Sequence, residues 1–562
     1  MKINRRQLIG LSFIICHLSF SAALLSCSDW DDHYEGKADA SAASSSETLW
    51  TQLKANAQLS DFCEVLEQTK VFRMHKKTSV SYADLLKGGQ TFTVVAPVNG
   101  SFNKDSLLQL VETAQGDSMV EKSFVKNLLS NSLRSVRADE AEMVLLNNKH
   151  VTIANGMIQG IQISQPNQTA KNGIIHVAAQ PLPFQPNLYE MLCDDPRFSA
   201  LGKLLRSYEE DYFDEESSVS SGIVDGVPIY VDSVILEHNA VLGNWNNGYE
   251  TERIGLLNAE DSVYWMVVPS GAAWDNAYAA VSKYFTYDGK MDEKKRDSLQ
   301  QKNTLEWLLC DAIFNMSNQK SVNDSILSVQ YIYERPNYSS PKPYYHVFKS
   351  PFAAGGILDP AKTTVRSCSN GLIYEAQEWP FDFTRTFFRP LWVEGERTWL
   401  ITEYNKCTYN TRQQVADSIS ENSYLRILPT DGTANWDMTF RVNNTLSGSY
   451  DIGIVVLPKA VYDQKNPNLK PCKFKANINY TDEKGVVKSY ACQNSAGKSE
   501  FTTDPEHVDT LWVAENFAFP ACGYGQPDMK VSLKLTCSIG ARETSKYNRE
   551  FYLDCIYLRP RP

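Results

Sequence analysis

Three aromatic residues in the last third of the chain have the chemistry to contact a sugar. Trp436, Trp512 and Tyr524 present flat, polarisable rings, which can pack against the apolar face of a pyranose. Tyr524 lies in residues 522–527, where two glycines and a proline predict a loop. The two tryptophans have a simpler alternative, which is burial in a hydrophobic core. We therefore place a ligand contact first at Tyr524, with Trp436 and Trp512 as further candidates.

The motifs that identify many enzymes and metal sites are absent from the sequence. No H-E-x-x-H, G-x-S-x-G, G-x-G-x-x-G or Walker loop occurs, and the eight histidines have no metal-ligand spacing. A catalytic pair of carboxylates leaves no such trace. The acidic run at 209–216 allows a cation site or a solvated loop, and we favour the loop. We predict no catalytic residue, no metal and no cofactor.

Charge and cysteine content restrict the partners and leave the redox state open. The formal net charge is −11 and no basic stripe occurs, which argues against nucleic acid as a partner. Six of the twelve cysteines lie after residue 400, and no C-x-x-C pair occurs. Disulfides and buried thiols both remain compatible with the sequence.

The N-terminus has the features of a targeting segment. A basic start containing Lys2, Arg5 and Arg6 precedes an apolar run over 8–25. Residues 24–27, Leu-Leu-Ser-Cys, resemble a bacterial lipobox, which implies a signal peptide at 1–26 and lipidation (diacylglycerol and a further acyl chain such as palmitate) of Cys27. A plain secretory signal with an incidental cysteine is the alternative.

The residues after Cys27 bear on where the chain would be anchored. Acidic residues at 29–32 resemble the surface-export signal of lipoproteins from Gram-negative gut anaerobes, although a solvated linker would look similar. The Ala/Ser-rich composition predicts a flexible tether over 27–46. We expect a lipid-anchored protein of the outer membrane, facing the cell exterior.

One local pattern occurs twice and organises the larger part of the chain. Residues 91–95 are rich in β-branched and aromatic types and predict a strand, which ends at Pro97. A turn follows at 99–101, and a helix is expected to start near Asn103. The same spacing of proline and aromatic residue returns at Pro269 and Trp274, which indicates an internal repeat.

Residues 47–184 resemble a fasciclin-like domain. The strand ending A-P-x-N-x-x-F at 96–102 and the closing N-G-I-I-H-V at 172–177 resemble the two signature boxes of that family, in the same order. The family implies a small β-sandwich or wedge with flanking helices and a role in adhesion or binding. A histidine that the family often carries between the boxes is replaced here by Leu128. We interpret His176 as a structural, hydrogen-bonded residue.

Residues 187–381 repeat this pattern in a more divergent form. A strand is predicted at 263–268, a long helix around Leu299 to Ile313, and a closing box at 370–374. Insertions are expected at 209–242 and around 331–349. Loops inserted on a rigid scaffold either carry binding sites or reflect neutral sequence drift.

Residues 385–562 predict an all-β sandwich. Strand patterns occur at 424–428, 436–442, 450–457, 474–480, 531–537 and 551–558, separated by turn residues. Segments 446–452 and 551–556 resemble jelly-roll, galactose-binding-like modules.

The sequence therefore predicts an α+β chain with two fasciclin-like domains followed by a jelly-roll-like sandwich. The resemblance implies a non-catalytic surface lipoprotein for adhesion, or for binding a glycan or matrix ligand. The alternative is an accessory subunit of an outer-membrane, starch-utilisation-type uptake complex, with a transporter as its partner. An enzyme with its active site in the last domain is a third hypothesis.

Overall fold

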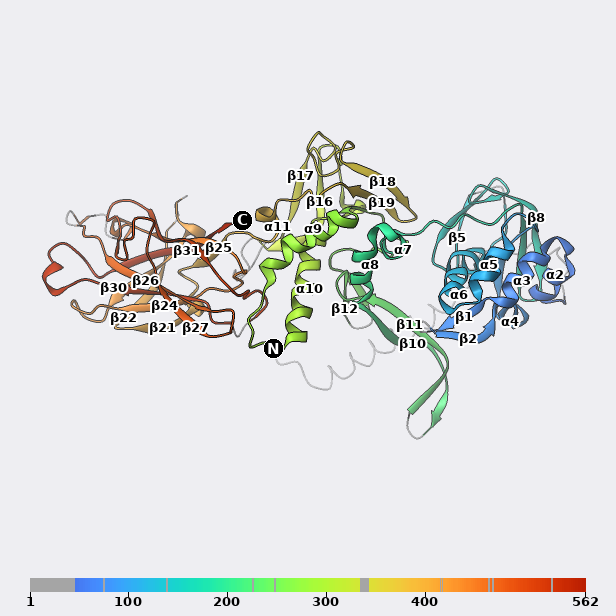
Figure 1. The fold of residues 1–562 in the computed structure, drawn as a ribbon, viewed down its shortest axis with the longest axis horizontal. Helices are drawn as coiled ribbons and strands as arrows, with labels where there is room; N and C mark the ends of the chain where they lie inside the picture. The colour runs from blue at the N-terminus through green and yellow to red at the C-terminus, as the bar shows by residue number, and fades with distance from the viewer. Residues whose placement is uncertain are drawn as a thin grey trace, which may run out of the picture. The chain divides into compact units, whose positions relative to one another are not determined.

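The computed structural model describes residues 46–562, apart from 74–75, 138–139, 225–226, 247–248, 334–342, 415, 417, 463–464, 467–468 and 527–528. The chain divides into two compact units, Met1–Gln185 and Pro186–Pro562. Both mix helices with sheets, and strands dominate (Figure 1). The predicted signal peptide, Cys27 and nearly all of the tether lie outside the described residues. Within the described part, no helix has the length and apolar character needed to cross a bilayer.

The first unit is a seven-stranded sheet with helices packed against it. The sheet order is β4-β3-β9-β8-β7-β6-β5, and the central pair β3 and β9 is parallel. Its strands are β3 (Phe92–Pro97), β4 (Leu129–Ser130), β5 (Ala141–Val144), β6 (His150–Ala154), β7 (Met157–Ile158), β8 (Ile161–Ala170) and β9 (Gly173–Ala178). The elements before β3 are α2 (Leu49–Ala55), the 3₁₀ helix η1 (Ala57–Leu59), α3 (Ser60–Gln68), the hairpin β1 (Lys70–Arg73) and β2 (Lys76–Ser81), and α4 (Tyr82–Lys87).

The predicted strand and turn are confirmed in this unit. All six residues of β3 are buried, because the strand lies inside the sheet with helices over it. Asn103 caps the helix α5 (Lys104–Val111) by accepting a hydrogen bond from the Ser106 N–H. A second helix, α6 (Ala114–Val120), continues into a π turn and a 3₁₀ turn that end at Leu128. Leu129 follows these turns and starts β4.

His176 is a structural residue, as predicted. It is fully buried, its Nε2–H donates to the Arg134 carbonyl at 2.8 Å, and its Nδ1 accepts from the Asn167 N–H at 3.1 Å. Burial lowers the pKa of the imidazole. Both ring nitrogens are therefore satisfied with the imidazole neutral.

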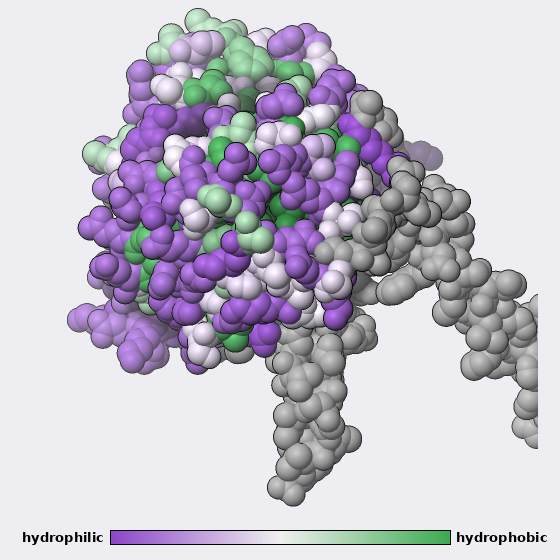
Figure 2. Space-filling view, turned by 90° about the vertical axis from the view of Figure 1, so that its right-hand side faces the viewer, coloured by the Kyte–Doolittle hydropathy of each residue, from purple (hydrophilic) through white to green (hydrophobic). Residues whose placement is uncertain are grey.

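The surface of the first unit is polar on the side that Figure 2 faces. Hydrophilic residues cover most of that side, and hydrophobic residues form small separate groups. Among the described residues of the unit, the exposed large hydrophobic ones are Val80, Leu110, Met119, Leu133 and Val144. Scattered apolar residues of this kind are normal for a surface in water.

The second unit begins with a smaller version of the same central arrangement. Its sheet order is β15-β14-β19-β18, with β14 (Tyr264–Pro269) and β19 (Gly371–Ala376) parallel. The other two strands are β15 (Ile313–Asn315) and β18 (Thr363–Cys368). In both units the parallel pair joins the proline strand to the strand of the closing box, from Phe92 opposite Gly173 and from Tyr264 opposite Gly371.

We call residues 187–381 the helical half of the second unit. Its main helices follow the same order as those of the first unit. They are α7 (Leu188–Asp194), the 3₁₀ helix η4 (Pro196–Phe198), α8 (Ser199–Arg206), α9 (Gly271–Ser282) and α10 (Glu293–Leu309). The predicted long helix is α10, but Ile313 lies in β15 and not in the helix. A break is required between them because residues 310–312 turn the chain back into the sheet.

The predicted insertions form β-hairpins. Residues 209–242 contain the long hairpin of β10 (Glu209–Val224) and β11 (Val227–Asn239), a separate two-stranded sheet that extends away from the elements around it in Figure 1. A short hairpin, β12 (Gly243–Asn246) and β13 (Tyr249–Glu252), follows it. The second insertion contains β16 (Ser325–Tyr333) and β17 (Pro343–Lys349). The favoured loop interpretation of 209–216 is wrong, because these residues lie in β10.

The last part of the chain is a sandwich of two antiparallel sheets. One sheet has the order β22-β23-β31-β25-β29, with β20 paired to β31, and the other has the order β21-β24-β30-β26-β27, with β28 paired to β26. The strands of the first are β20 (Leu391–Glu394), β22 (Cys407–Gln413), β23 (Ser423–Pro429), β25 (Ser449–Val456), β29 (Asp509–Ala518) and β31 (Phe551–Arg561). The strands of the second are β21 (Ile401–Asn405), β24 (Asp437–Arg441), β26 (Lys473–Thr481), β27 (Val487–Ala491), β28 (Phe501–Thr502) and β30 (Ser532–Cys537).

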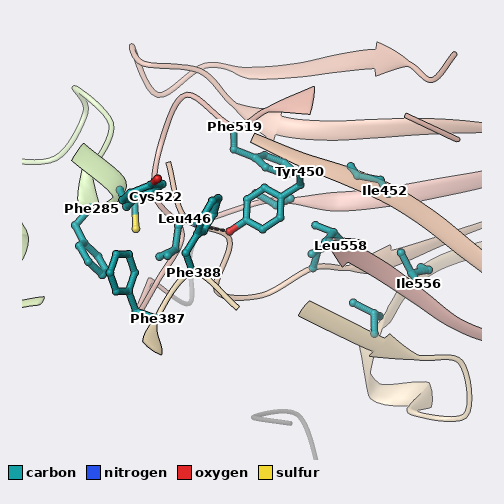
Figure 3. Close-up of a cluster of buried hydrophobic side chains, with 14 of the residues drawn as sticks. Phe285, Phe387, Phe388, Leu446, Tyr450, Ile452, Phe519, Cys522, Ile556 and Leu558 are labelled. Carbon is teal, nitrogen blue, oxygen red and sulfur yellow. Dashed lines mark hydrogen bonds between the residues drawn. The ribbon is translucent and has the colours of Figure 1, made fainter. Parts of the chain in front are cut away.

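The sandwich and the helical half of the second unit share one hydrophobic core. The Phe388 ring lies 5.1 Å from the ring of Tyr450 of β25 (Figure 3). On its other side, the ring of Tyr284, after α9, has its centroid 4.6 Å away. The Tyr450 hydroxyl accepts a hydrogen bond from the Leu446 N–H at 3.1 Å. The predicted segments 187–381 and 385–562 therefore pack as one unit. All ten cysteines after Cys27 are buried, and the structure holds them as thiols.

Candidate functional site

One row of residues crosses the outer face of the β22-β23-β31-β25-β29 sheet. Trp392 of β20 lies opposite Tyr557 of β31, Tyr557 lies opposite Gly453 of β25, and Gly453 lies opposite Trp512 of β29. Residues directly opposite each other in antiparallel strands have side chains on the same face. The neighbouring positions Ile452 and Ile556 point the other way, into the core (Figure 3). The row therefore lies on the face away from the sandwich core.

The rings of this row form a continuous aromatic surface. The ring centroids of Trp392 and Tyr557 are 4.2 Å apart, and those of Tyr557 and Trp512 are 6.1 Å apart. All three residues are half-buried, so part of each remains accessible. We call Trp392, Tyr557 and Trp512 the aromatic row.

A glycine allows the rings to meet across a strand that contributes no ring. A Cβ atom at Gly453 would lie 3.3 Å from the Trp512 ring and 3.0 Å from Thr510 Cγ2. A side chain at this position would press on the indole and on Thr510. Gly453 thus leaves the Trp512 ring room to lie beside Tyr557.

An ion network holds a guanidinium group over one end of the row. The Arg559 guanidinium lies 4.3 Å from the centroid of the Trp512 ring, within cation–π distance. Arg559 and Arg561 both donate to the buried carboxylate of Asp451, at 2.7 Å each, and the Asn516 N–H donates to it at 2.9 Å. Burial opposes ionisation of Asp451, but hydrogen bonds from Arg561, Asn516 and Arg559 lower its pKa. The ionised carboxylate fixes Arg559 beside the indole.

The structure places the three candidates from the sequence in three different environments. Trp512 lies in the aromatic row. Trp436 is fully buried, its indole N–H donates to the Arg549 carbonyl at 2.6 Å, and its ring packs 5.4 Å from Phe551. Trp436 therefore has no exposed ring face and serves the core, which is the alternative that the sequence offered.

Tyr524 lies in the predicted loop but its ring faces the protein. The ring is half-buried, 6.0 Å from both the Phe285 and Trp307 rings of the helical half. Burial raises the pKa of its hydroxyl to about 12. The backbone carbonyl of Tyr524 accepts a hydrogen bond from the Tyr287 hydroxyl at 3.2 Å. Tyr524 thus helps to join the sandwich to the helical half, and it does not lie near Trp512 in the row.

A cleft opens beside the loop of Tyr524. It has a volume of about 340 Å³ and lies between the segment after β24 and the loop that carries Tyr524. The hydroxyl of Thr445, in its wall, is fully buried without a hydrogen-bond partner. The residues that line it are Arg441, Val442, Asn443, Asn444, Thr445, Gly523, Gly525, Gln526, Met529 and Val531. Five of these ten residues have polar side chains, so the cleft offers hydrogen-bonding groups beside apolar ones.

Sequence reasoning missed Trp392 and Tyr557. Tyr557 alternates with Ile556 and Leu558 in the predicted last strand, and this period of two could have placed it on the outer face. Trp392 had no such signal, because β20 is four residues long. Among the described residues, no three His, Cys, Asp or Glu side chains are grouped to hold a metal ion.

Comparisons with known proteins give only remote likenesses. No protein-family model matches the chain, and no curated protein matches it. A solved pair of FAS1 domains from the insect cell adhesion molecule fasciclin I is 10% identical, covers 60% of this chain and 97% of its own, and has a TM-score of 0.16.

Two further likenesses are to carbohydrate-binding modules. A xylan-binding domain of family 22 is 9% identical, covers 30% of this chain and 86% of its own, and has a TM-score of 0.19. The C-terminal family 22 module of Clostridium thermocellum Xyn10B is 10% identical, covers 30% and 85%, and has a TM-score of 0.18. The function proposed below therefore rests on the chain's own residues.

Proposed function

We propose that this protein is a non-catalytic binding protein that captures a glycan on the aromatic row of its C-terminal sandwich. The supporting observation is the alignment of Trp392, Tyr557 and Trp512 across adjacent strands, with Gly453 keeping them in contact. The ring planes of Trp392 and Tyr557 are inclined by 37° and those of Tyr557 and Trp512 by 59°, so each ring offers its own face to a sugar, and rigid strands hold the rings in place at low entropic cost. Arg559 at one end supplies hydrogen-bond donors for sugar hydroxyls.

The remainder of the chain fits a surface-attached protein. We propose that Cys27 carries the lipid anchor in the outer membrane and that 47–184 and 187–381 are fasciclin-like domains serving adhesion. The shared register of the parallel strand pairs in the two segments supports the repeat. Protease treatment of intact cells tests the placement, since an outward-facing chain would be cut.

A second candidate is an accessory role in an outer-membrane uptake complex. The hairpin of β10 and β11 favours it, because these strands pair only with each other in the described structure. Unpaired strand edges can accept a strand from a partner. Co-purification of a β-barrel transporter in detergent, lost when residues 210–238 are replaced by a short turn, is the expected result.

The glycan hypothesis is tested on a glycan array with the soluble chain that begins after Cys27. Trp512→Ala should lower affinity for the captured glycan at least about fivefold, because stacking contributes on the order of 1 kcal/mol per ring. Trp392→Ala should also lower the affinity for this glycan. Trp399→Ala is the matched control, since Trp399 is 60% exposed on the same sandwich but lies outside the row.

Two outcomes would contradict this function. Failure of the intact chain to bind any glycan is one. Equal affinities for Trp512→Ala, Trp392→Ala and the control would also exclude the aromatic row. Hydrolysis of a bound glycan, abolished by changing one carboxylate, would replace the binding role with an enzymatic one.

A further inference from the structure

The two copies of the repeated pattern differ at the turn after the proline strand. In both, a helix, a 3₁₀ turn and a second helix precede the strand, and the second helix starts at Ser60 in one copy and at Ser199 in the other. Two residues after the strand's last proline, the first copy has Asn99 and the second has Gly271. The side chain at this position decides whether the turn is tied to the helices.

In the first copy, the Asn99 carboxamide is bound at all its polar atoms. Its Nδ2 donates to the Ala57 carbonyl and to Ser60 Oγ, both at 2.9 Å. Its Oδ1 accepts from the Asp61 N–H in the first turn of α3, also at 2.9 Å. The Ala57 carbonyl, the Ser60 hydroxyl and the Asp61 N–H therefore form a binding site for a primary amide. The side chain of Asn99 fills this site.

In the second copy, no side chain fills the corresponding space. A Cβ atom at Gly271 would meet nothing within 4 Å. Among the described hydrogen bonds, none joins Gly271 to residues 196–200. A cleft of about 210 Å³ lies between the two segments, and its apolar side is formed by Phe198, Leu201 and Trp274, each buried.

The polar groups that bind Asn99 in the first copy have counterparts in this cleft. Ser199 corresponds to Ser60, the Pro196 carbonyl to that of Ala57, and the Ala200 N–H to that of Asp61. Among the described residues, no side-chain oxygen caps α8 by accepting a hydrogen bond from the N–H groups of its first turn. The Pro196 carbonyl accepts from the Ser199 N–H but retains a second lone pair.

The charges around the cleft favour a neutral ligand. Arg197 is paired with Asp195 and lies 3.5 Å from a carboxylate oxygen of Glu375. Asp275 lies in the cleft wall. An anionic ligand would face Asp275 without an uncompensated cation beside it.

We propose that this cleft binds a primary carboxamide, the side chain of an asparagine or glutamine residue presented by a partner polypeptide. Both N–H groups of the amide donate, to Ser199 Oγ and the Pro196 carbonyl, and its oxygen accepts from the Ala200 N–H. A carboxylate lacks the two donors, and a secondary amide has only one. The cleft belongs to the helical half of the second unit, so this inference does not depend on the glycan hypothesis.

The test uses the soluble chain that begins after Cys27 and asparagine blocked at both termini as the probe. Ligand-observed NMR should show saturable, weak binding of blocked asparagine and blocked glutamine, as expected for a small fragment. Blocked aspartate should bind at least about tenfold more weakly, because it loses two donors and gains a charge. Blocked leucine should not bind.

Two variants locate the binding. Gly271→Asn should abolish probe binding, because its own carboxamide would compete for the cleft, and asparagine is among the residues found most often at a positive φ such as the 51° here. Ser199→Ala should weaken binding about fivefold to tenfold through loss of one acceptor. Ser207→Ala, at the other end of α8, is the control and should bind normally.

The outcomes separate clearly. No saturable binding of blocked asparagine to the intact chain overturns the proposal, and so does binding that Ser199→Ala and Gly271→Asn leave unchanged. Equal affinity for asparagine and aspartate would also overturn it. If Gly271→Asn does not fold, Ser199→Ala against Ser207→Ala still decides the question.

Discussion

The Asn172 side-chain oxygen accepts a hydrogen bond from the backbone N–H of Leu49 at 2.8 Å. The Nδ2 of Asn172 donates to the carbonyls of Leu86 and Gly88, at 3.0 and 2.9 Å. In the second copy Asn370 repeats the contact, with the Leu188 N–H at 2.9 Å. The asparagine of each closing box therefore ties the first helix of its copy to the central strands. This contact explains why both closing boxes begin with asparagine.

Replacing Asn172 should destabilise the first unit. Asn172→Ala leaves a buried N–H and two carbonyls without partners, at a cost of about 2–4 kcal/mol. Denaturant unfolding followed by a signal from the first unit measures the change. Gln115→Ala, at an exposed helix position, should stay within about 0.5 kcal/mol of the natural chain. Equal stabilities of the two variants would refute the structural role of Asn172.

Asp451 should confer stability that depends on pH. Its carboxyl is fully buried, and its folded-state pKa is lowered, so its contribution is present above the unfolded pKa of about 3.9. The contribution is lost as pH falls through the folded pKa. Asp451→Asn should cost about 1–3 kcal/mol at neutral pH, discounted for the half-exposed arginines, and much less near pH 2.

The control for Asp451 is an exposed ion pair. Glu378 is 68% exposed and pairs with Lys362 at 2.8 Å, so Glu378→Gln should leave the stability nearly unchanged at every pH. Urea midpoints at several pH values measure both variants. A cost for Asp451→Asn that does not change with pH would contradict the assignment.

The stability that depends on Glu396 should change with pH in the opposite direction, falling as pH rises. Burial, with the neighbouring Glu394 and Glu421, raises the pKa of this carboxyl to about 8. The folded protein therefore holds a proton there that the unfolded chain releases, and the resulting stability is lost as pH rises from about 4.5 to about 8. Glu396→Gln, which cannot ionise, should be more stable than the natural chain by about 1–3 kcal/mol near pH 9 and similar to it near pH 4. Thermal melts across this pH range give the comparison, and parallel curves would rule the effect out.

Phe388 should couple the sandwich to the helical half. Phe388→Ala opens a cavity between Tyr284 and Tyr450 and should cost about 3–5 kcal/mol. Hydrogen exchange should show both halves losing protection together, because they share one core. Phe352→Ala, which removes a half-buried ring from a separate cluster, should affect the helical half alone. Independent loss of protection in the Phe388 variant would contradict the shared core.

Several elements could be predicted from residue order because their signals are local. The strand before Pro97, the helix start near Asn103 and the closing strand after Gly173 follow from β-branched runs and turn residues that are neighbours in the chain. The alternation of apolar residues likewise predicted the strands β24, β25 and β30.

Sequence alone determined the repeat and the β-rich last third, because each depends on residues within one strand, turn or closing box. The tertiary structure decided that Trp436 is a core residue, that Tyr524 packs on Trp307, and that Trp512 meets Tyr557 and Trp392. Strand order and register bring residues 392, 453, 512 and 557 together, and no local pattern encodes which strands become neighbours. The cleft opposite Gly271 likewise exists only because two distant segments face each other across a missing side chain.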